Sequence, residues 1–312
     1  MKVLVTGACG YKGSVLVPKL LRRGYSVVAF DIQWFGNFLE PHPQLEVVQG
    51  DVRDTDGIDL TGIDAIIHLS SIANDPCGDL DPKLTWEISC LATMQLADRA
   101  KRQGIKRFIY ASSGSVYGVK EEEHVTEDLP LLPISEYNKT KMCAERILLS
   151  YSDDMTVQIV RPATVCGYSP RMRLDVSVNM LTMQALRNGR ITVFGGQQTR
   201  PNIHIDDITD LYLFLLETPQ HTGIFNAGFE NLAIMEIAEM VTRHVPAEVV
   251  VSPSNDPRSY RINSDRLLAT GFRPRKSVED AIQEMIDLYR RGQLTDSDQW
   301  YNLKWMQSGA AK

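Results

Sequence analysis

The sequence predicts an α/β protein built on a doubly wound parallel sheet, followed by a smaller region that faces a ligand. Strand-like runs alternate with segments of helical periodicity, which favours one parallel sheet with helices on both faces. This alternation breaks down between Pro162 and Pro201, where proline and glycine become frequent. The strand-like runs occupy residues 2–6, 26–30, 45–49, 64–69, 107–112 and 156–161.

The first of these strands leads into a turn that suits a dinucleotide. Gly7, Gly10 and Gly13 provide a tight turn, a close approach of the backbone to a pyrophosphate, and close packing of strand and helix. The second strand-like run ends in Asp31, at about the 20-residue distance where an acidic side chain can hold the ribose hydroxyls. Asp31 would repel a 2′-phosphate and Gln33 offers no charge to attract one, so we expect NAD.

Composition excludes several classes of protein. The chain has 312 residues, of which 43% are apolar and 23% charged, as is ordinary for a soluble globular protein. A net charge of −6 argues against nucleic-acid binding. No apolar stretch approaches about 18 residues and the chain starts with a strand, so we expect a cytoplasmic protein without membrane contact. Neither disulfides nor a metal site is indicated by its cysteines, Cys9, Cys77, Cys90, Cys143 and Cys166.

A tyrosine and a lysine carry the sharpest catalytic signal. Tyr137 and Lys141 are four residues apart, on one face of an expected helix. A tyrosine with a pKa of about 10 is a poor base, but a nearby ammonium and an oxidised nicotinamide favour the phenolate. The same spacing also occurs by chance on solvated helix faces. Of the eleven tyrosines, however, only Tyr137 has a lysine four residues on.

Small hydroxyl side chains follow the strand at 107–112. Ser112, Ser113 and Ser115 lie where this strand ends. In an open parallel sheet, ligands bind at that carboxyl edge. The alternative is a serine-rich turn without a functional role. The interval between these serines and Tyr137 is about the length of a helix, which favours a functional role for the serines.

Together these motifs resemble the extended short-chain dehydrogenase/reductases, specifically the NAD-dependent nucleotide-sugar epimerases and dehydratases, which have a Rossmann-type fold. The similarity spans essentially the whole length, and the order and spacing of the motifs carry it. Besides the glycine turn, Asp31 and the Tyr137–Lys141 pair, these motifs are 50–53, 68–71, 112–118, 161–162, 167–173, Asn179, 199–207, 225–228 and 256–260.

The resemblance implies a role for individual residues. Ser113 would hydrogen-bond the sugar hydroxyl that is oxidised, beside Tyr137 and Lys141, and Lys141 would also reach the nicotinamide ribose. The implied cofactor contacts, besides the glycines and Asp31, are Tyr11, Lys12, Asp51, Val52, Leu69, Ser70, Ser71, Tyr137 and Lys141. The implied substrate contacts are Ser113, Ser115, Arg171, Arg173, Asn179, Arg200 and Arg258, the arginines suiting phosphate oxygens.

Departures from the family pattern argue against two of the family's reactions. Family 4,6-dehydratases carry an Asp-Glu pair after the catalytic hydroxyl residue, where this chain has Gly114 and Ser115. Neither can act as a general acid or base. The family's 3,5-epimerases place a cysteine at the position of Ser115 and a lysine in the later loop, which here has arginines.

Two further positions depart from the family pattern. Lys12 replaces a usual apolar residue, where it would touch a phosphate, and Ser89 replaces a usual asparagine.

These expectations describe an NAD-dependent nucleotide-sugar epimerase that works through a 4-keto intermediate. The alternatives are a net C4 dehydrogenase or reductase of a nucleotide-activated heptose or deoxysugar, and a non-catalytic NAD-binding scaffold. We expect an NAD-binding domain at 1–164 plus 203–228 and a nucleotide-sugar domain at 165–202 plus 229–312. Apolar residues beyond one inward stripe on the helices near 82–103 and 138–150 predict a homodimer, with a deeper monomer core as the alternative. A helix is also expected near 278–291.

Overall fold

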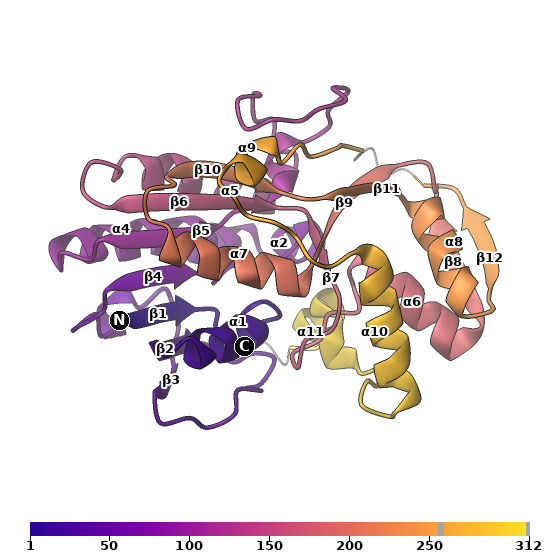
Figure 1. Cartoon of the computed structure of the whole chain (residues 1–312), viewed down its shortest axis with the longest axis horizontal. Coiled ribbons are helices and arrows are strands. Elements are labelled where there is room, and N and C mark those ends of the chain that lie inside the picture. Colours follow the sequence, from indigo (N-terminus) through magenta and orange to yellow (C-terminus); the bar gives the residue numbers. More distant parts are fainter. Residues whose placement is uncertain (255–258, 310–312) are drawn as a thin grey trace.

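A seven-stranded parallel sheet forms one half of the molecule (Figure 1). The structure is a computed structural model that describes residues 1–254 and 259–309. The strand order is β10-β6-β5-β4-β1-β2-β3, and every neighbouring pair is parallel. The strands are β1 (Lys2–Thr6), β2 (Ser26–Asp31), β3 (Leu45–Gln49), β4 (Ala65–His68), β5 (Arg107–Ala111), β6 (Thr156–Pro162) and β10 (Gly223–Ala227). The predicted fold class is confirmed. The sheet contains the six predicted strands and a seventh, β10, that was not predicted.

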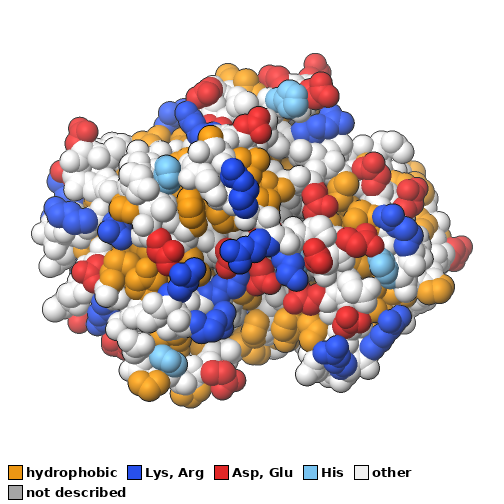
Figure 2. Space-filling model, viewed as in Figure 1, with side chains coloured by type: hydrophobic (Ala, Val, Ile, Leu, Met, Phe, Trp, Pro, Cys, Tyr) orange, Lys and Arg blue, Asp and Glu red, His pale blue; other side chains and the backbone are white. Residues whose placement is uncertain are grey.

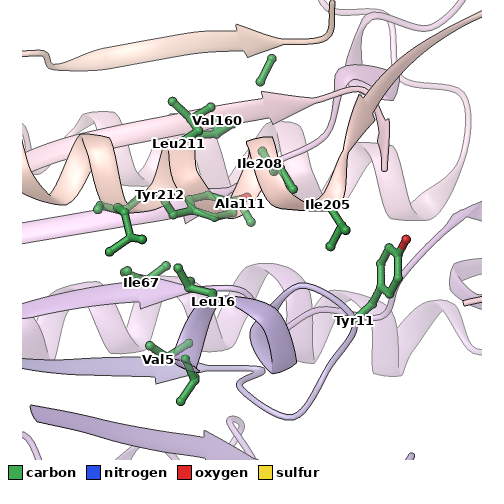
Figure 3. Packing of buried hydrophobic residues seen from close by; sticks show 14 of the residues in the cluster. Val5, Tyr11, Leu16, Ile67, Ala111, Val160, Ile205, Ile208, Leu211 and Tyr212 are labelled. Carbon is green, nitrogen blue, oxygen red and sulfur yellow. The ribbon is translucent and has the colours of Figure 1, made fainter. Parts of the chain in front are cut away.

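Helices cover both faces of this sheet. The pair α1 (Gly13–Arg22) and α7 (Ile205–Glu217) packs on one face, and α4 (Ala92–Arg102) and α5 (Glu136–Leu149) pack on the other (Figure 1). Between the first pair and the sheet lies a core of fully buried apolar side chains (Figure 3), among them Val5, Leu16, Ile67, Ile208 and Leu211.

The second half is smaller and carries its own apolar core. Its elements are β7 (Thr164–Cys166), α6 (Ser177–Asn188), β8 (Arg190–Phe194), β9 (Thr199–His204), β11 (Glu230–Ala233), α8 (Ile234–His244), β12 (Glu248–Ser252) and α10 (Val278–Arg290). β12 pairs with β8, and β9 lies between β11 and β7. The short elements are η1 (Thr55–Gly57), α2 (Asp75–Leu80), α3 (Pro82–Trp86), η2 (Glu87–Leu91), η3 (Gly114–Tyr117), α9 (Asp265–Ala269), η4 (Asp298–Trp300) and α11 (Asn302–Gln307).

The carboxyl-terminal segment returns to the large sheet. The Trp305 indole donates a hydrogen bond of 2.8 Å to the carbonyl of Trp34, in the loop after β2. The rings of Phe38 and Trp300 pack with centroids 5.5 Å apart. Residues expected to belong to the substrate domain therefore contact the loop that follows Asp31.

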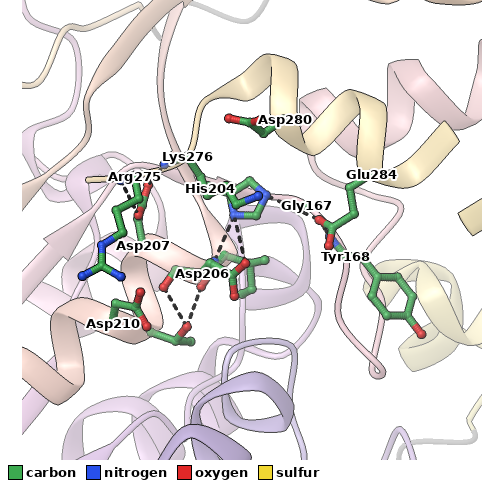
Figure 4. A network of polar contacts seen from close by, with 12 residues as sticks. Gly167, Tyr168, His204, Asp206, Asp207, Asp210, Arg275, Lys276, Asp280 and Glu284 are labelled. Atoms are coloured by element: carbon green, nitrogen blue, oxygen red, sulfur yellow. Dashed lines mark hydrogen bonds and ion pairs between the residues drawn. The ribbon is translucent and has the colours of Figure 1, made fainter. Parts of the chain in front are cut away.

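A polar network ties α7 to α10 and to the loop after β7 (Figure 4). His204 begins α7 by accepting a hydrogen bond from the Asp206 amide. Asp207 accepts hydrogen bonds from the amides of Arg275 and Lys276, at 2.8 and 3.0 Å. From α10, Glu284 accepts a hydrogen bond from the amide of Tyr168, in the loop that carries the predicted arginines. The network thus anchors that loop to α10, and the segment before α10 to α7.

The surface carries both signs of charge. On the face drawn in Figure 2, Lys and Arg side chains are interspersed with Asp and Glu. None of the helices within residues 1–254 and 259–309 combines the length and the apolar character needed to cross a membrane. All five cysteines carry free thiols.

Candidate active site

One cavity of about 550 Å³ runs from the glycine turn to the second half of the molecule. It lies at the carboxyl edge of the sheet, where the order of connections reverses between β1 and β4 and where doubly wound folds bind ligands. Most of the predicted site residues line it: Gly7, Gly10, Tyr11, Lys12, Gly13, Asp31, Asp51, Val52, Leu69, Ser70, Ser71, Ser113, Ser115, Tyr137, Lys141, Arg171, Arg173 and Arg200.

The glycine turn forms one wall of this cavity. Gly7 has a φ of +69°, and a Cβ there would lie 2.7 Å from the backbone nitrogen of Ser70. A Cβ at Gly13 would lie 2.3 Å from the carbonyl oxygen of Ala8. Only glycine therefore lets β1, the turn and α1 approach so closely. The amino end of α1 faces the cavity, as a pyrophosphate site requires.

Replacing Gly13 with alanine should damage both stability and cofactor binding. The added methyl group would collide with backbone, which cannot rotate away, so we expect a loss of roughly 1–3 kcal/mol in the free energy of unfolding. Urea denaturation and a titration with NAD measure the two effects. Arg22→Ala, at the exposed far end of α1, is the control and should change neither. A Gly13→Ala protein with wild-type stability and NAD affinity would contradict this description of the turn.

Asp31 and Arg171 mark one end of the cavity. The Asp31 carboxylate accepts hydrogen bonds from the amides of Cys9 and Gln33, at 2.9 and 2.7 Å. Burial raises its pKa, and the two amides and the charge of Arg171 oppose that rise. The Arg171 guanidinium lies 3.9 Å from the ring centroid of Phe35 and donates to Asn302, 2.6 Å away. Arg171, predicted to contact the substrate, thus lies beside the group predicted to hold the cofactor's ribose.

Ser113, Tyr137 and Lys141 meet further along the cavity. Ser113 begins η3 just after β5, and Tyr137 and Lys141 occupy the first two turns of α5. All three side chains line the cavity. The Lys141 ammonium donates to the carbonyl of Ala111 at 2.8 Å and lies 5.9 Å from the centroid of the Tyr137 ring. The two catalytic signals in the sequence are therefore neighbours in space.

The surroundings of these groups oppose charge. Burial raises the pKa of Tyr137 to about 12. Ser113 and Arg173 oppose this rise, and the Asp75 carboxylate adds to it. Burial and the charge of Lys12 hold the pKa of Lys141 well below its usual range. Burial and Arg173 lower the pKa of Lys12 to about 8. Cations thus crowd this part of the cavity, and an anionic ligand would stabilise them.

Arg173 is held in place from both sides. Its guanidinium pairs with the Asp175 carboxylate through two hydrogen bonds, of 2.9 and 3.1 Å. Asn74 and the backbone of Asn302 donate to the same carboxylate. Asn179 accepts from the Gly167 amide and donates to the Arg173 carbonyl. Arg173 is therefore a fixed cation inside the cavity.

One predicted substrate contact, Asn179, lies outside the cavity lining. Asn179 is fully buried in α6, where its amide bonds to the loop around Gly167 and to Tyr11, and it is not among the cavity-lining residues. Asn179 therefore stabilises the conformation of the loop between Gly167 and Arg173. Arg258 lies outside the described residues.

Other lining residues are absent from the predictions. Asn74 and Asp75 line the cavity and follow Ser70 and Ser71, just after β4. Polar residues that follow a strand at the carboxyl edge often contact a ligand, so their position in the sequence could have identified them. Phe35, Asp175 and Asn302 also line the cavity. Asn302 comes from a segment far away in sequence, and no local pattern marks it.

Comparison with known proteins agrees with this arrangement. Residues 3–228 match the model of the NAD dependent epimerase/dehydratase family. UDP-glucose 4-epimerase of Lactobacillus helveticus is 27% identical over 90% of this chain and 95% of its own length. UDP-glucuronic acid decarboxylase 1 of Arabidopsis thaliana is also 27% identical, over 96% of this chain and 72% of its own length.

A solved structure is also similar to this chain in sequence and fold. UDP-glucuronic acid 4-epimerase from Bacillus cereus, in complex with UDP-glucuronic acid and NAD, is 28% identical and superposes with a TM-score of 0.80. The match covers 93% of this chain and 99% of that protein. Relatives of similar identity thus include proteins named as epimerases and as decarboxylases.

Proposed function

Because the chain belongs to the NAD-dependent epimerase/dehydratase family, we propose that it is a nucleotide-sugar 4-epimerase. One observation carries the proposal: a single cavity joins the glycine turn to Ser113, Tyr137 and Lys141 and continues to Arg173. The cofactor is NAD, and the glycine turn and Asp31 fit it at one end of the cavity. Bound NAD would take a hydride from the sugar and return it.

The proposed chemistry assigns one proton to Tyr137. Its phenolate would accept the proton of the sugar's C4 hydroxyl, and its phenol would return that proton when the ketone is reduced. Lys141 would stabilise the phenolate electrostatically, since its ammonium lies over the same ring system. Ser113 would bind the reacting oxygen. The 4-keto sugar would turn within the cavity before hydride returns to its other face.

The cations of the cavity support a nucleotide diphosphate as the part of the substrate that the protein holds. Arg173 is fixed by Asp175, and Arg200 lines the wall toward β8 and α8. Guanidinium groups of this kind bind phosphate oxygens through paired hydrogen bonds. Binding through the diphosphate would leave the sugar free to rotate while it is retained.

The neighbourhood of Ser113 argues against dehydration. Removing protons at C5 and water at C6 needs a carboxyl acid and base beside the sugar. Gly114 and Ser115 supply neither. The carboxylates of Asp75 and Asp175, which do line the cavity, already accept hydrogen bonds from protein groups. Simple hydride exchange at C4 remains the reaction that these residues support best.

The experiment is an incubation of purified protein with GDP-, UDP-, dTDP- and CDP-sugars, followed by NMR of the products. UDP-glucose comes first, because the relatives named above act on UDP-sugars by name. We expect a C4 epimer to form without added cofactor beyond what the protein binds. Product formed only in proportion to added NAD or NADH would instead favour the net dehydrogenase or reductase.

We also propose that two copies of the chain associate through the helices near 82–103 and 138–150, together with the neighbouring α2. Large apolar side chains are exposed there, namely Leu80, Trp86, Leu91 and Met94. Exposed apolar groups gathered on neighbouring helices are typical of protein interfaces. The two-domain division predicted from the sequence likewise stays our proposal, with the cavity between the two parts.

A further inference from the structure

Asn74 has a backbone conformation that is otherwise almost confined to glycine. Its φ is +77° and its ψ is 162°. In this region the Cβ of an L-residue crowds its own backbone, so the conformation persists only where the surrounding structure enforces it. Residues of this kind gather at functional sites. Asn74 lines the cavity, so the strained backbone lies inside the candidate active site.

The chain on both sides of Asn74 is fixed. Before it, the Ile72 amide donates to the Ser89 hydroxyl at 3.3 Å, and the Ile72 side chain is buried. After it, α2 packs on α5 so closely that a Cβ at Gly78 would lie 2.9 Å from the Cβ of Tyr137. The two flanks therefore impose the backbone angles of Asn74.

The side chain of Asn74 uses both ends of its amide. Its oxygen accepts a hydrogen bond of 3.0 Å from the Cys77 amide and so caps α2. Its nitrogen donates to the Asp175 carboxylate at 3.1 Å. Asp175 also accepts two hydrogen bonds from the Arg173 guanidinium, of 2.9 and 3.1 Å. Asn74 thus connects the helix that packs on Tyr137 to the pair formed by Arg173 and Asp175.

The pair formed by Arg173 and Asp175 does not fix its own direction. The two residues are two positions apart on one loop, so their side chains could stay paired and turn together. Two groups outside that loop hold the carboxylate, namely the Asn74 amide and the backbone nitrogen of Asn302, which donates at 3.2 Å. Of these two, Asn74 comes from the wall of the cavity beside Tyr137. The charge of Arg173 reaches this wall, since it opposes the rise in the pKa of Tyr137.

We propose that Asn74 is a positioning residue that holds Arg173 toward the wall beside Tyr137 and thereby sets the affinity of the cavity for the nucleotide diphosphate. The proposal rests on the proposed function, which assigns the diphosphate to Arg173. Glycine would adopt the same backbone angles without strain, but it has no amide to reach Asp175. Asparagine at this position therefore sacrifices stability for the hydrogen bond, as residues of functional sites often do.

Two substitutions separate the strain from the hydrogen bonds. Asn74→Gly and Asn74→Ala remove the same side-chain bonds, but only glycine adopts these backbone angles freely. We expect both variants to bind a nucleoside diphosphate roughly 10-fold more weakly than the wild type, as for the loss of one hydrogen bond to a charged group. We expect Asn74→Gly to unfold at a higher temperature than Asn74→Ala. Two proteins of different stability would then lose the same affinity, which a purely structural role does not produce.

The measurement is a calorimetric titration of the NAD-loaded protein with UDP, GDP, dTDP or CDP, using whichever binds most tightly, together with thermal unfolding. Ser277→Gly is the matched control, because Ser277 caps α10 by accepting a hydrogen bond of 3.1 Å from the Asp280 amide and does not line the cavity. It should lower the unfolding temperature and leave the affinity unchanged. Wild-type affinity in Asn74→Gly, with a loss in Arg173→Ala, overturns the proposal.

A double substitution decides whether Asn74 acts through Arg173. Asn74→Gly combined with Arg173→Ala should bind the nucleotide no more weakly than Arg173→Ala alone. A further loss in the double variant would mean that Asn74 touches the nucleotide itself, and it would overturn the positioning role. Unchanged affinity in Arg173→Ala would instead contradict the diphosphate contact and refute this proposal with it. Because the titration needs no turnover, its result is separate from the 4-epimerase assignment.

Discussion

Tyr137→Phe should lower kcat by about 10²–10⁴-fold while NAD binding is retained. The substitution removes only the hydroxyl that exchanges a proton with the sugar, and the ring that packs near Lys141 stays. The measurement combines steady-state turnover with a calorimetric titration of NAD. Since burial raises the pKa of Tyr137 to about 12, little phenolate exists at neutral pH without help, and the rate of sugar oxidation should rise with pH.

Tyr151→Phe, a tyrosine just beyond α5 that does not line the cavity, provides the control and should keep full activity. Turnover that survives in Tyr137→Phe would exclude Tyr137 as the base. A wild-type protein that binds NAD but turns over none of the nucleotide sugars, with Tyr137→Phe indistinguishable from it, would favour the non-catalytic scaffold.

Glu145→Ala should destabilise the fold by roughly 3–5 kcal/mol, because it leaves a buried guanidinium without the carboxylate that neutralises its charge. The side chains of Glu145 and Arg161 are 1% and 2% exposed, and they bond through both carboxylate oxygens, with a shortest contact of 2.7 Å. Glu145 also accepts from Ser112, the neighbour of Ser113 in the chain. The pair thus connects α5 to β6 directly behind the active site.

Urea denaturation measures this effect as a change in the free energy of unfolding. Asp98→Ala breaks an exposed ion pair with Arg102 on α4 and should cost at most about 0.5 kcal/mol. Similar losses in the two variants would contradict the structural role given to the buried pair. Glu145→Gln keeps the shape and one acceptor, so its loss should lie between the two.

Periodicity and turn chemistry were enough to predict the main sheet. Glycine spacing and the acidic end of β2 located one end of the cavity, because strand, turn and helix there are contiguous in sequence. The Tyr137–Lys141 pair was predictable for the same reason, since one helix sets its spacing. The strand β10 was not predicted because it follows the stretch from Pro162 to Pro201, where the regular βα alternation breaks down.

Contacts between distant segments could not be predicted in this way. Arg171 lines the cavity, and its guanidinium there contacts Phe35 and Asn302, which come from two segments distant from it in sequence. Asn302 reaches the cavity only because the carboxyl-terminal segment folds back over the loop after β2. The hydrogen bonds from Ser115 to Asn138 and from Asn138 to Asp75 likewise join three elements, and no single stretch of sequence contains them.

Following solvent deuterium into the product by NMR tests the central claim most directly. If the hydrogen removed from C4 returns to C4, nucleotide sugar converted in deuterated water should give the C4 epimer with no deuterium on any sugar carbon. Deuterium at C3, C5 or C6 would mean proton transfer at those carbons, and a dehydratase or 3,5-epimerase would replace the proposed 4-epimerase.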